Sequence, residues 1–252
     1  MTRLKGLALP LALVALWQAW ASIFGVHSDT LSKPSDILAS LVSGLADGSL
    51  LAATLSTLAA AGGGLLLGAA LGVACGLLFG LIPTVSRLMR VTVEMLRPIP
   101  AVAMAPIVLL VFGFGYRLEI AIVAFACFFP MMILTEAAIR QIAPRLMEVA
   151  RVLRLSGGQR VAKVVVPASL PRIFVALRLA AGLALIVAVT VEIAVNPMGL
   201  GYRLMLAAQS LRPADMFATL IWIGLLGWAL NFALVRIGAL LFAPGSAPRG
   251  AS

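Results

Sequence analysis

The sequence predicts an all-α integral membrane protein with about six transmembrane helices. Of its 252 residues, 62% are hydrophobic and only 11% are charged, and the mean hydropathy is +1.11. Soluble domains contain about 45–50% apolar and about 25% charged residues, so a soluble fold of this size could not bury so much apolar surface. The apolar residues form long runs that do not alternate with polar ones, which excludes a membrane β-barrel.

Six apolar runs separated by polar segments supply the predicted spans. They cover residues 7–24, 52–82, 98–114, 118–134, 173–195 and 217–242. The basic start of the first run also allows a secretory signal, but more spans follow, and a retained anchor is the simpler interpretation. The polar segment 26–50 is expected to carry a short surface helix that starts near Ser35 or Asp36. Pro98 and Pro100 favour a helix entrance or a kink.

Glycines recur at every fourth position of the second run, which places them on one helix face where another helix can approach closely. They are Gly64, Gly68, Gly72, Gly76 and Gly80. We interpret this face as plain helix packing and not as a ligand site.

Basic residues orient the chain, whose net charge is +10. In the six-span arrangement, 15 of the 19 Lys and Arg fall on one side, and only Lys33, Arg117, Arg203 and Arg212 fall on the other. Cytoplasmic loops carry the Lys and Arg excess, so both termini are predicted to be cytoplasmic. Topology and lipid headgroups thus account for the charge, which implies neither a nucleic-acid partner nor an anionic solute.

Three segments follow from this arrangement. We predict a first transmembrane anchor with an external loop (1–51), a transmembrane core (52–241) and a flexible cytoplasmic tail (242–252). Side chains for catalysis are scarce, since the chain has one histidine, and Cys75 and Cys127 lack the spacing of metal ligands. We therefore expect no catalytic residue and no metal site, and an enzyme embedded in the membrane is disfavoured.

The longest polar stretch, residues 136–171, separates the fourth run from the fifth and would be cytoplasmic. From Glu148 onward it can form a short amphipathic helix with Val149, Val152 and Leu153 on one side. Glu148 lies near the start of this helix, where the helix dipole favours a carboxylate. A short helix between two spans can dock into a partner and pass the partner's motion to both spans, so we expect a coupling helix here.

Glycines and prolines bound this coupling helix. We expect the helix to break at Gly157 and Gly158, which favour turns. A further helical piece should then stop at Pro167 and Pro171, before the fifth span begins.

This loop resembles that of the permease subunits of binding-protein-dependent ABC importers. In that family a Glu-Ala-Ala motif is followed three residues on by Gly, then by nine residues and an Ile-x-Leu-Pro-like ending. Here Glu148, Val149 and Ala150 match the start, and three valines followed by Pro167 match the end at the same spacing. The glycine position holds Arg154, which leaves the usual turn open, with Gly157-Gly158 as the alternative place for it.

Other segments resemble the branch of that family that imports nitrate, sulfonates, taurine and related small anions. They are residues 96–100 with 112–115, residues 167–174, and Glu192 with residues 199–202. The resemblance covers roughly residues 52–241. It implies a subunit that moves a small solute, such as a sulfonate, nitrate or a taurine-like compound, inward across the bacterial plasma (inner) membrane.

The resemblance also implies partners. They are a second copy of this chain in a homodimer, two cytoplasmic ABC ATPase subunits docked on residues 148–159, an external or periplasmic solute-binding protein, and membrane lipid. No cofactor is expected in this chain, because ATP and Mg²⁺ would bind to the partner ATPase. The implied ATPase-coupling residues are Glu148, Val149, Ala150, Arg151, Leu155, Ser156, Gly157, Gly158 and Pro167.

Residues 155–159 spell Leu-Ser-Gly-Gly-Gln, which is the signature of ABC ATPase subunits. That signature works only beside a phosphate-binding loop of the form G-x-x-x-x-G-K-[ST], which this chain lacks. We therefore interpret the segment as a helix end with two glycines and not as a nucleotide site.

Glu192 is the one acidic residue well inside an apolar run. Carboxylates within a membrane are costly and often functional, so Glu192, with Asn196 and Met104, is a candidate for the translocation path. The alternative is that Glu192 lies near the external end and reaches interfacial water. A stand-alone secondary transporter or channel is the rival function, but intramembrane charge pairs and an inverted repeat are both missing from the sequence.

Overall fold

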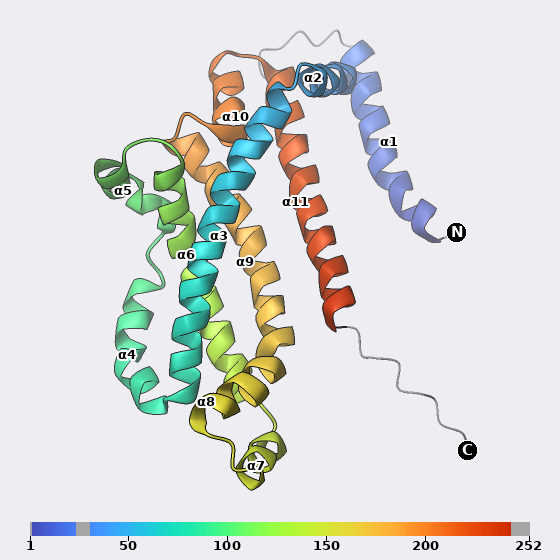
Figure 1. The fold of residues 1–252 in the computed structure, drawn as a ribbon. Helices are drawn as coiled ribbons and strands as arrows, with labels where there is room; N and C mark the ends of the chain where they lie inside the picture. The colour runs from blue at the N-terminus through green and yellow to red at the C-terminus, as the bar shows by residue number, and fades with distance from the viewer. Residues whose placement is uncertain (1, 24–30, 243–252) are drawn as a thin grey trace, which may run out of the picture. The chain divides into compact units, whose positions relative to one another are not determined.

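The computed structural model describes residues 2–23 and 31–242, and all the regular structure in these residues is helical. The elements are α1 (Thr2–Ile23), α2 (Pro34–Ala46), α3 (Ser49–Leu81), α4 (Pro83–Leu96), η1 (Ala101–Met104), α5 (Ala105–Phe112), α6 (Tyr116–Arg140), α7 (Pro144–Val152), α8 (Gly157–Arg160), η2 (Val161–Val165), α9 (Val166–Ala194), α10 (Gly199–Gln209) and α11 (Pro213–Phe242) (Figure 1). The predicted flexible tail (242–252) lies outside the described residues from residue 243 onward.

Among the described residues, four helical stretches are long and apolar enough to cross a bilayer alone: α3, α6, α11 and the stretch Gly157–Ala194, which ends in α9. A fifth span results if α4 and the helix Ala101–Phe112 are counted together. Within α1, the described segment Ala12–Ile23 is a shorter apolar helix. The all-α membrane class is confirmed, whereas the number six stays a prediction.

The third predicted run is preceded by a helix that the sequence does not predict. Helix α4 is amphipathic, and its polar residues mask it in a search for apolar runs. It is bent by 80° from the following helix at a break of four residues or fewer. Pro98 and Pro100 lie in this break, where their missing N–H groups and fixed φ angles oppose a continuous helix. The expected kink is therefore confirmed.

The helices gather into two compact units, which we describe separately. The first unit comprises Met1–Leu58 and Val189–Leu226, and the second comprises Ala59–Ala188 and Gly227–Ser252. The boundaries fall inside α3, α9 and α11, so each of these helices contributes residues to both units.

In the second unit, the glycine face of α3 packs directly on α6 (Figure 1). A Cβ atom added at Gly72 would lie 2.6 Å from Met131 Cβ, and one added at Gly76 would lie 2.6 Å from the Met132 carbonyl oxygen. Side-chain atoms essentially never come so close, so only glycine permits this helix spacing. The interpretation of this face as plain helix packing is confirmed.

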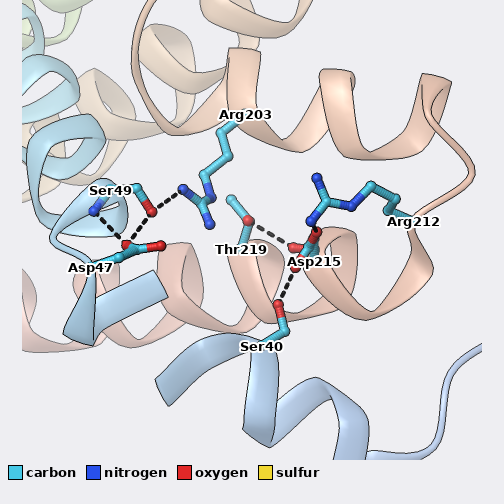
Figure 2. A network of polar contacts seen from close by, with 7 residues as sticks. All are labelled: Ser40, Asp47, Ser49, Arg203, Arg212, Asp215 and Thr219. Atoms are coloured by element: carbon cyan, nitrogen blue, oxygen red, sulfur yellow. Dashed lines mark hydrogen bonds and ion pairs between the residues drawn. The ribbon is translucent and has the colours of Figure 1, made fainter. Parts of the chain in front are cut away.

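In the first unit, two sets of polar contacts link neighbouring helices, one joining the start of α3 to α10 and the other joining α2 to the start of α11 (Figure 2). The Asp47 carboxylate accepts hydrogen bonds from the Ser49 N–H at 2.8 Å and the Ser49 hydroxyl at 2.6 Å. Arg203 donates to the Ser49 hydroxyl oxygen at 2.6 Å. Asp215 accepts from the Ser40 hydroxyl and forms an ion pair with Arg212. The surface helix expected near Ser35 is α2, as predicted.

Candidate functional site

Helix α7 is the predicted coupling helix, and it lies between α6 and the stretch that leads into α9 (Figure 1). Pro144 at its first turn suits a helix start, because the first N–H groups of a helix have no acceptor. Ala150 is buried, and α7 contacts η2. Val152, on the opposite side of α7, is 82% exposed, and Leu153, which directly follows the helix, is 63% exposed. This combination leaves an apolar surface on a short helix that is held in place on its other side.

The turn after α7 forms at Arg154, which has the left-handed backbone angle φ 50°. The Arg154 N–H donates to the Arg151 carbonyl at 2.9 Å, and the Leu155 N–H donates to the Ala150 carbonyl at 3.1 Å. Left-handed backbone favours glycine, since other L-residues pay about 1–2 kcal/mol there. The turn therefore stays at the position where the family has glycine. The alternative turn at Gly157-Gly158 is wrong, because both glycines begin α8.

The segment Leu155 to Gln159 begins a helix and does not end one. The Ser156 hydroxyl oxygen accepts from the Gln159 N–H at 3.4 Å, and the Gln159 side-chain oxygen accepts from the Ser156 N–H at 3.1 Å. This reciprocal pair is a capping box, which satisfies the free N–H groups of a helix start. The Ser156 and Gln159 side chains of the ATPase-like signature thus stabilise the start of α8. The interpretation of this segment as the end of a helix with two glycines is wrong, because the segment starts a helix.

Pro167 and Pro171 do not stop a helical piece, because both lie inside α9. The helix continues through η2, which has π-helical hydrogen bonds, including one from the Val166 N–H to the Val161 carbonyl. The wider π turn comes directly before Pro167, whose ring would otherwise clash with the carbonyl four residues earlier. From α8 onward the helix therefore continues into α9 without a break.

The predicted coupling residues thus occupy one segment of the second unit. Most of them are exposed, Leu155 is half-buried and Ala150 is buried. The exposed ones are Glu148, Val149, Arg151, Ser156, Gly157, Gly158 and Pro167.

Glu192 and Asn196 lie in the first unit, where α9 ends and α10 begins, and each is 1% exposed. One carboxylate oxygen of Glu192 accepts from the Gly201 N–H at 2.7 Å. The Thr57 hydroxyl oxygen accepts from the Leu200 N–H at 2.9 Å. These N–H groups belong to the first turn of α10, where the helix dipole favours a carboxylate. Glu192 thus caps α10 from within the fold, which differs from the expected reach to interfacial water.

Glu119 and Thr57 are two of the other buried polar residues in the described part of the chain, and the sequence pattern does not identify them as candidates. Glu119 is 1% exposed and lies in the first turn of α6. The sequence signal that could have identified Glu119 is its position shortly after Gly115, where a helix starts, because acidic residues favour the first turn of a helix. Thr57 gave no signal, since its partner Leu200 is distant in sequence. Met104, the remaining candidate for the path, ends η1 in the second unit and is half-buried.

Comparison with known proteins decides the family. The model of the binding-protein-dependent transport system inner membrane component matches residues 64–243. The chain belongs to this family. It is thus the membrane-spanning permease subunit of an ABC importer, a transport subunit whose ATPase is a separate chain and which works with a solute-binding protein. The rival stand-alone transporter or channel finds no support.

Three similar proteins show which transporters this permease resembles. It is 34% identical over 234 residues to SsuC of Bacillus subtilis strain 168, named as an aliphatic sulfonates transport permease, covering 93% of this chain and 84% of SsuC. It is 29% identical to the bicarbonate transport permease CmpB of Synechococcus elongatus, in a match that covers 91% of this chain and 87% of CmpB. The inward-facing MetNI methionine ABC transporter is similar in fold, with a TM-score of 0.68 at 22% identity, covering 83% of this chain and 99% of that chain.

Proposed function

We propose that this permease carries a small oxyanion into the cell. A relative 34% identical to it is named for aliphatic sulfonates, and another at 29% is named for bicarbonate. Both solutes are compact and carry their negative charge on oxygen atoms. The net charge of +10 is not part of this argument, because the topology of the chain already accounts for it. A separate solute-binding protein would deliver the anion and set most of the selectivity.

The coupling surface of the permease is the α7–α8 segment, residues 144–160. The observation that carries this proposal is the exposed apolar pair Val152 and Leu153 at the end of α7, which lies in the chain between two long apolar helical stretches. Exposed apolar surface of this kind is typical of a protein interface. Glu148 and Arg151, also exposed, would give the contact its polar rim.

The working assembly is a homodimer of this chain with two ATPase subunits, in a bacterial plasma membrane. Both termini and the α7–α8 segment would face the cytoplasm, which agrees with 15 of the 19 Lys and Arg falling on that side. The ATPase subunits would hold ATP and Mg²⁺. Their closure on ATP would move α7 and α8, and α9 would carry this motion into the membrane, opening the dimer outward.

The coupling proposal is tested by purifying the tagged permease from native membranes in mild detergent and identifying its partners by mass spectrometry. We expect the ATPase to co-purify with the wild type and to be lost with Glu148→Arg. The control is Asp36→Arg, which makes the same charge change at an exposed residue of α2. Retention of the ATPase and normal uptake by Glu148→Arg would overturn the proposed coupling surface.

The solute class is tested separately, with the importer and its binding protein in liposomes. We expect ATP-dependent uptake of labelled ethanesulfonate or bicarbonate, and no uptake of a neutral or cationic compound of similar size. Transport of a neutral solute alone would overturn the oxyanion proposal and leave the coupling surface unaffected.

A further inference from the structure

Helix α4 carries its charged side chains on one face. Arg87, Arg90, Glu94 and Arg97 follow one another at intervals of three, four and three residues, which keeps them on the same side of a helix. All four line a cavity of about 380 Å³ in the second unit. The other walls of this cavity come from α3 and α6, with Phe79 of α3 at one wall.

The opposite face of α4 is apolar and exposed. Leu88 is 70% exposed, Val91 is 60% exposed and Met95 is 69% exposed. In a soluble protein this arrangement would be inverted, since the apolar face would be buried. In a permease the apolar face can meet lipid or another subunit. The charged face turns to an open cavity, in which the Arg90 and Glu94 side chains are 76% and 65% exposed, and charged residues of membrane proteins are usually found at such water-accessible cavities.

The charges in the cavity do not balance. It contains four guanidinium groups and two carboxylates. Arg90 pairs with Glu94 at 3.0 Å, and Arg140 pairs with Glu136 at 2.7 Å. Within the described part of the chain, no ion pair is formed by the two remaining arginines, Arg87 and Arg97.

The polar groups around α6 are already held in place. The Ser86 hydroxyl donates to a Glu136 carboxylate oxygen at 2.7 Å, and Arg140 donates to the Ser86 oxygen at 3.1 Å. This network fixes one wall of the cavity and leaves Arg87 and Arg97 available on the α4 side. The remaining walls include Met132 and Ile133, which add an apolar surface.

We infer that this cavity is an oxyanion-binding site, with Arg87 and Arg97 as its principal ligands. A guanidinium group presents several N–H donors in a plane and matches the oxygen atoms of a sulfonate or phosphate. Two such groups without carboxylate partners favour a bound anion, which neutralises their charge. The volume of about 380 Å³ has room for a group of this size beside an apolar substituent.

Two sources of the oxyanion group fit the chemistry. One is a free anion in solution, either inorganic phosphate or the transported solute, and only the solute case rests on the proposed function. The other is the phosphodiester of an anionic phospholipid, since basic pockets between membrane helices bind such headgroups. Arg97 also lines a second, mainly apolar cavity of about 320 Å³ under the bend after α4.

The experiment uses the intact importer with its ATPase, purified in detergent and stripped of bound lipid. Calorimetry measures binding of ethanesulfonate and inorganic phosphate, and native mass spectrometry measures retention of phosphatidylglycerol against phosphatidylcholine. We expect at least one of the anionic probes to bind, and Arg87→Gln with Arg97→Gln to weaken that binding at least tenfold. The control, Arg117→Gln, changes an exposed arginine at the start of α6 and should leave binding unchanged.

A second variant keeps the inference testable if the arginine variants fold poorly. Glu94→Gln removes a carboxylate from the cavity and releases Arg90, so the affinity for the same probe should rise severalfold. Misfolding cannot produce such a gain. If no anionic probe binds, or if binding is the same in wild type, the double arginine variant and Glu94→Gln, the inference is wrong.

The outcomes also separate the two sources and the two proposals. Binding of phosphate or ethanesulfonate assigns the site to a free anion, whereas selective retention of phosphatidylglycerol alone assigns it to lipid. Uptake of ethanesulfonate by a wild type that binds none of the probes would overturn this site and leave the proposed function intact. Binding without oxyanion uptake would leave the site and overturn the proposed solute class.

Discussion

Glu148 lies in the middle of α7 and Glu192 near the end of α9, and their surroundings differ completely. The expectation that Glu148 lies near a helix start is wrong, because α7 begins at Pro144 and has no acidic residue in its first turn. Glu148 is exposed on α7, beside apolar side chains that nothing in the described chain covers. Glu192 is 1% exposed and accepts a hydrogen bond from the Gly201 N–H at 2.7 Å. We propose that the first meets another protein, whereas the second holds two helices of its own unit together. A change at Glu192 should therefore affect folding, and a change in the α7 segment should affect coupling.

The largest effect is expected at Gly201, where α10 lies directly against the backbone of α9. A Cβ atom added at Gly201 would lie 2.7 Å from Glu192 Cβ and would also meet the Val189 carbonyl oxygen. Gly201→Ala should therefore separate α10 from α9 and destabilise the protein by about 1–3 kcal/mol or more, as overpacking does. Thermal unfolding in detergent measures the loss.

A matched control for Gly201→Ala is Gly182→Ala, because a Cβ atom there would have nothing within 4 Å. Alanine also favours a helix interior over glycine, so this control should be neutral or slightly stabilising. Equal unfolding temperatures for the two variants would contradict the close packing of the α9–α10 junction.

The next largest effect concerns the Glu192 side chain itself. Glu192→Leu leaves the Gly201 N–H buried without its acceptor, which should cost about 1–3 kcal/mol. Glu192→Gln keeps an oxygen that can accept this hydrogen bond, so its unfolding temperature should stay close to that of the wild type. Uptake by the well-folded Glu192→Gln then tests the predicted role in the translocation path. Unchanged uptake would remove that role.

The sequence predicts the coupling segment better than the α9–α10 junction, for a physical reason. The coupling segment is local, so its amphipathic pattern and Glu148 could be found from neighbouring residues. The α9–α10 junction depends on contacts such as the one between Thr57 and Leu200, which lie far apart in the chain. The sequence pattern places Glu192 inside an apolar run, but it cannot identify the N–H group that donates a hydrogen bond to the Glu192 carboxylate. The wrong expectations for Pro167 and Pro171 have a similar origin, because the π turn before them has no clear sequence signature.

Arg154 gives a prediction of intermediate size, and its sign is a gain. Its left-handed backbone, φ 50°, is strained for an arginine. Arg154→Gly should relieve this strain and stabilise the turn by up to about 1 kcal/mol, less the greater entropy that glycine loses on folding. Arg154→Val should destabilise the turn, because a β-branched residue is least tolerant of positive φ. Unfolding temperatures and ATPase association of the two variants check the order.

If Arg154→Gly weakens ATPase association and leaves the unfolding temperature unchanged, the arginine side chain contributes to docking and the strain argument is wrong. The control is Arg151→Gly, which places glycine inside α7. It should cost roughly 1 kcal/mol of helix stability.

The smallest effect belongs to a third carboxylate, Asp47, which is exposed but hydrogen-bonded. The Ser49 hydroxyl, and after it the Ser49 N–H, lower the pKa of Asp47 below its usual 3.8. A lowered pKa stabilises the folded state above the unfolded value, and the benefit is lost as the pH falls through the folded pKa. Asp47→Asn should thus lower the unfolding temperature slightly at pH 7, and the difference from the wild type should shrink below pH 3.8. A difference that persists in acid would mean that Asp47 acts through packing and not through its charge.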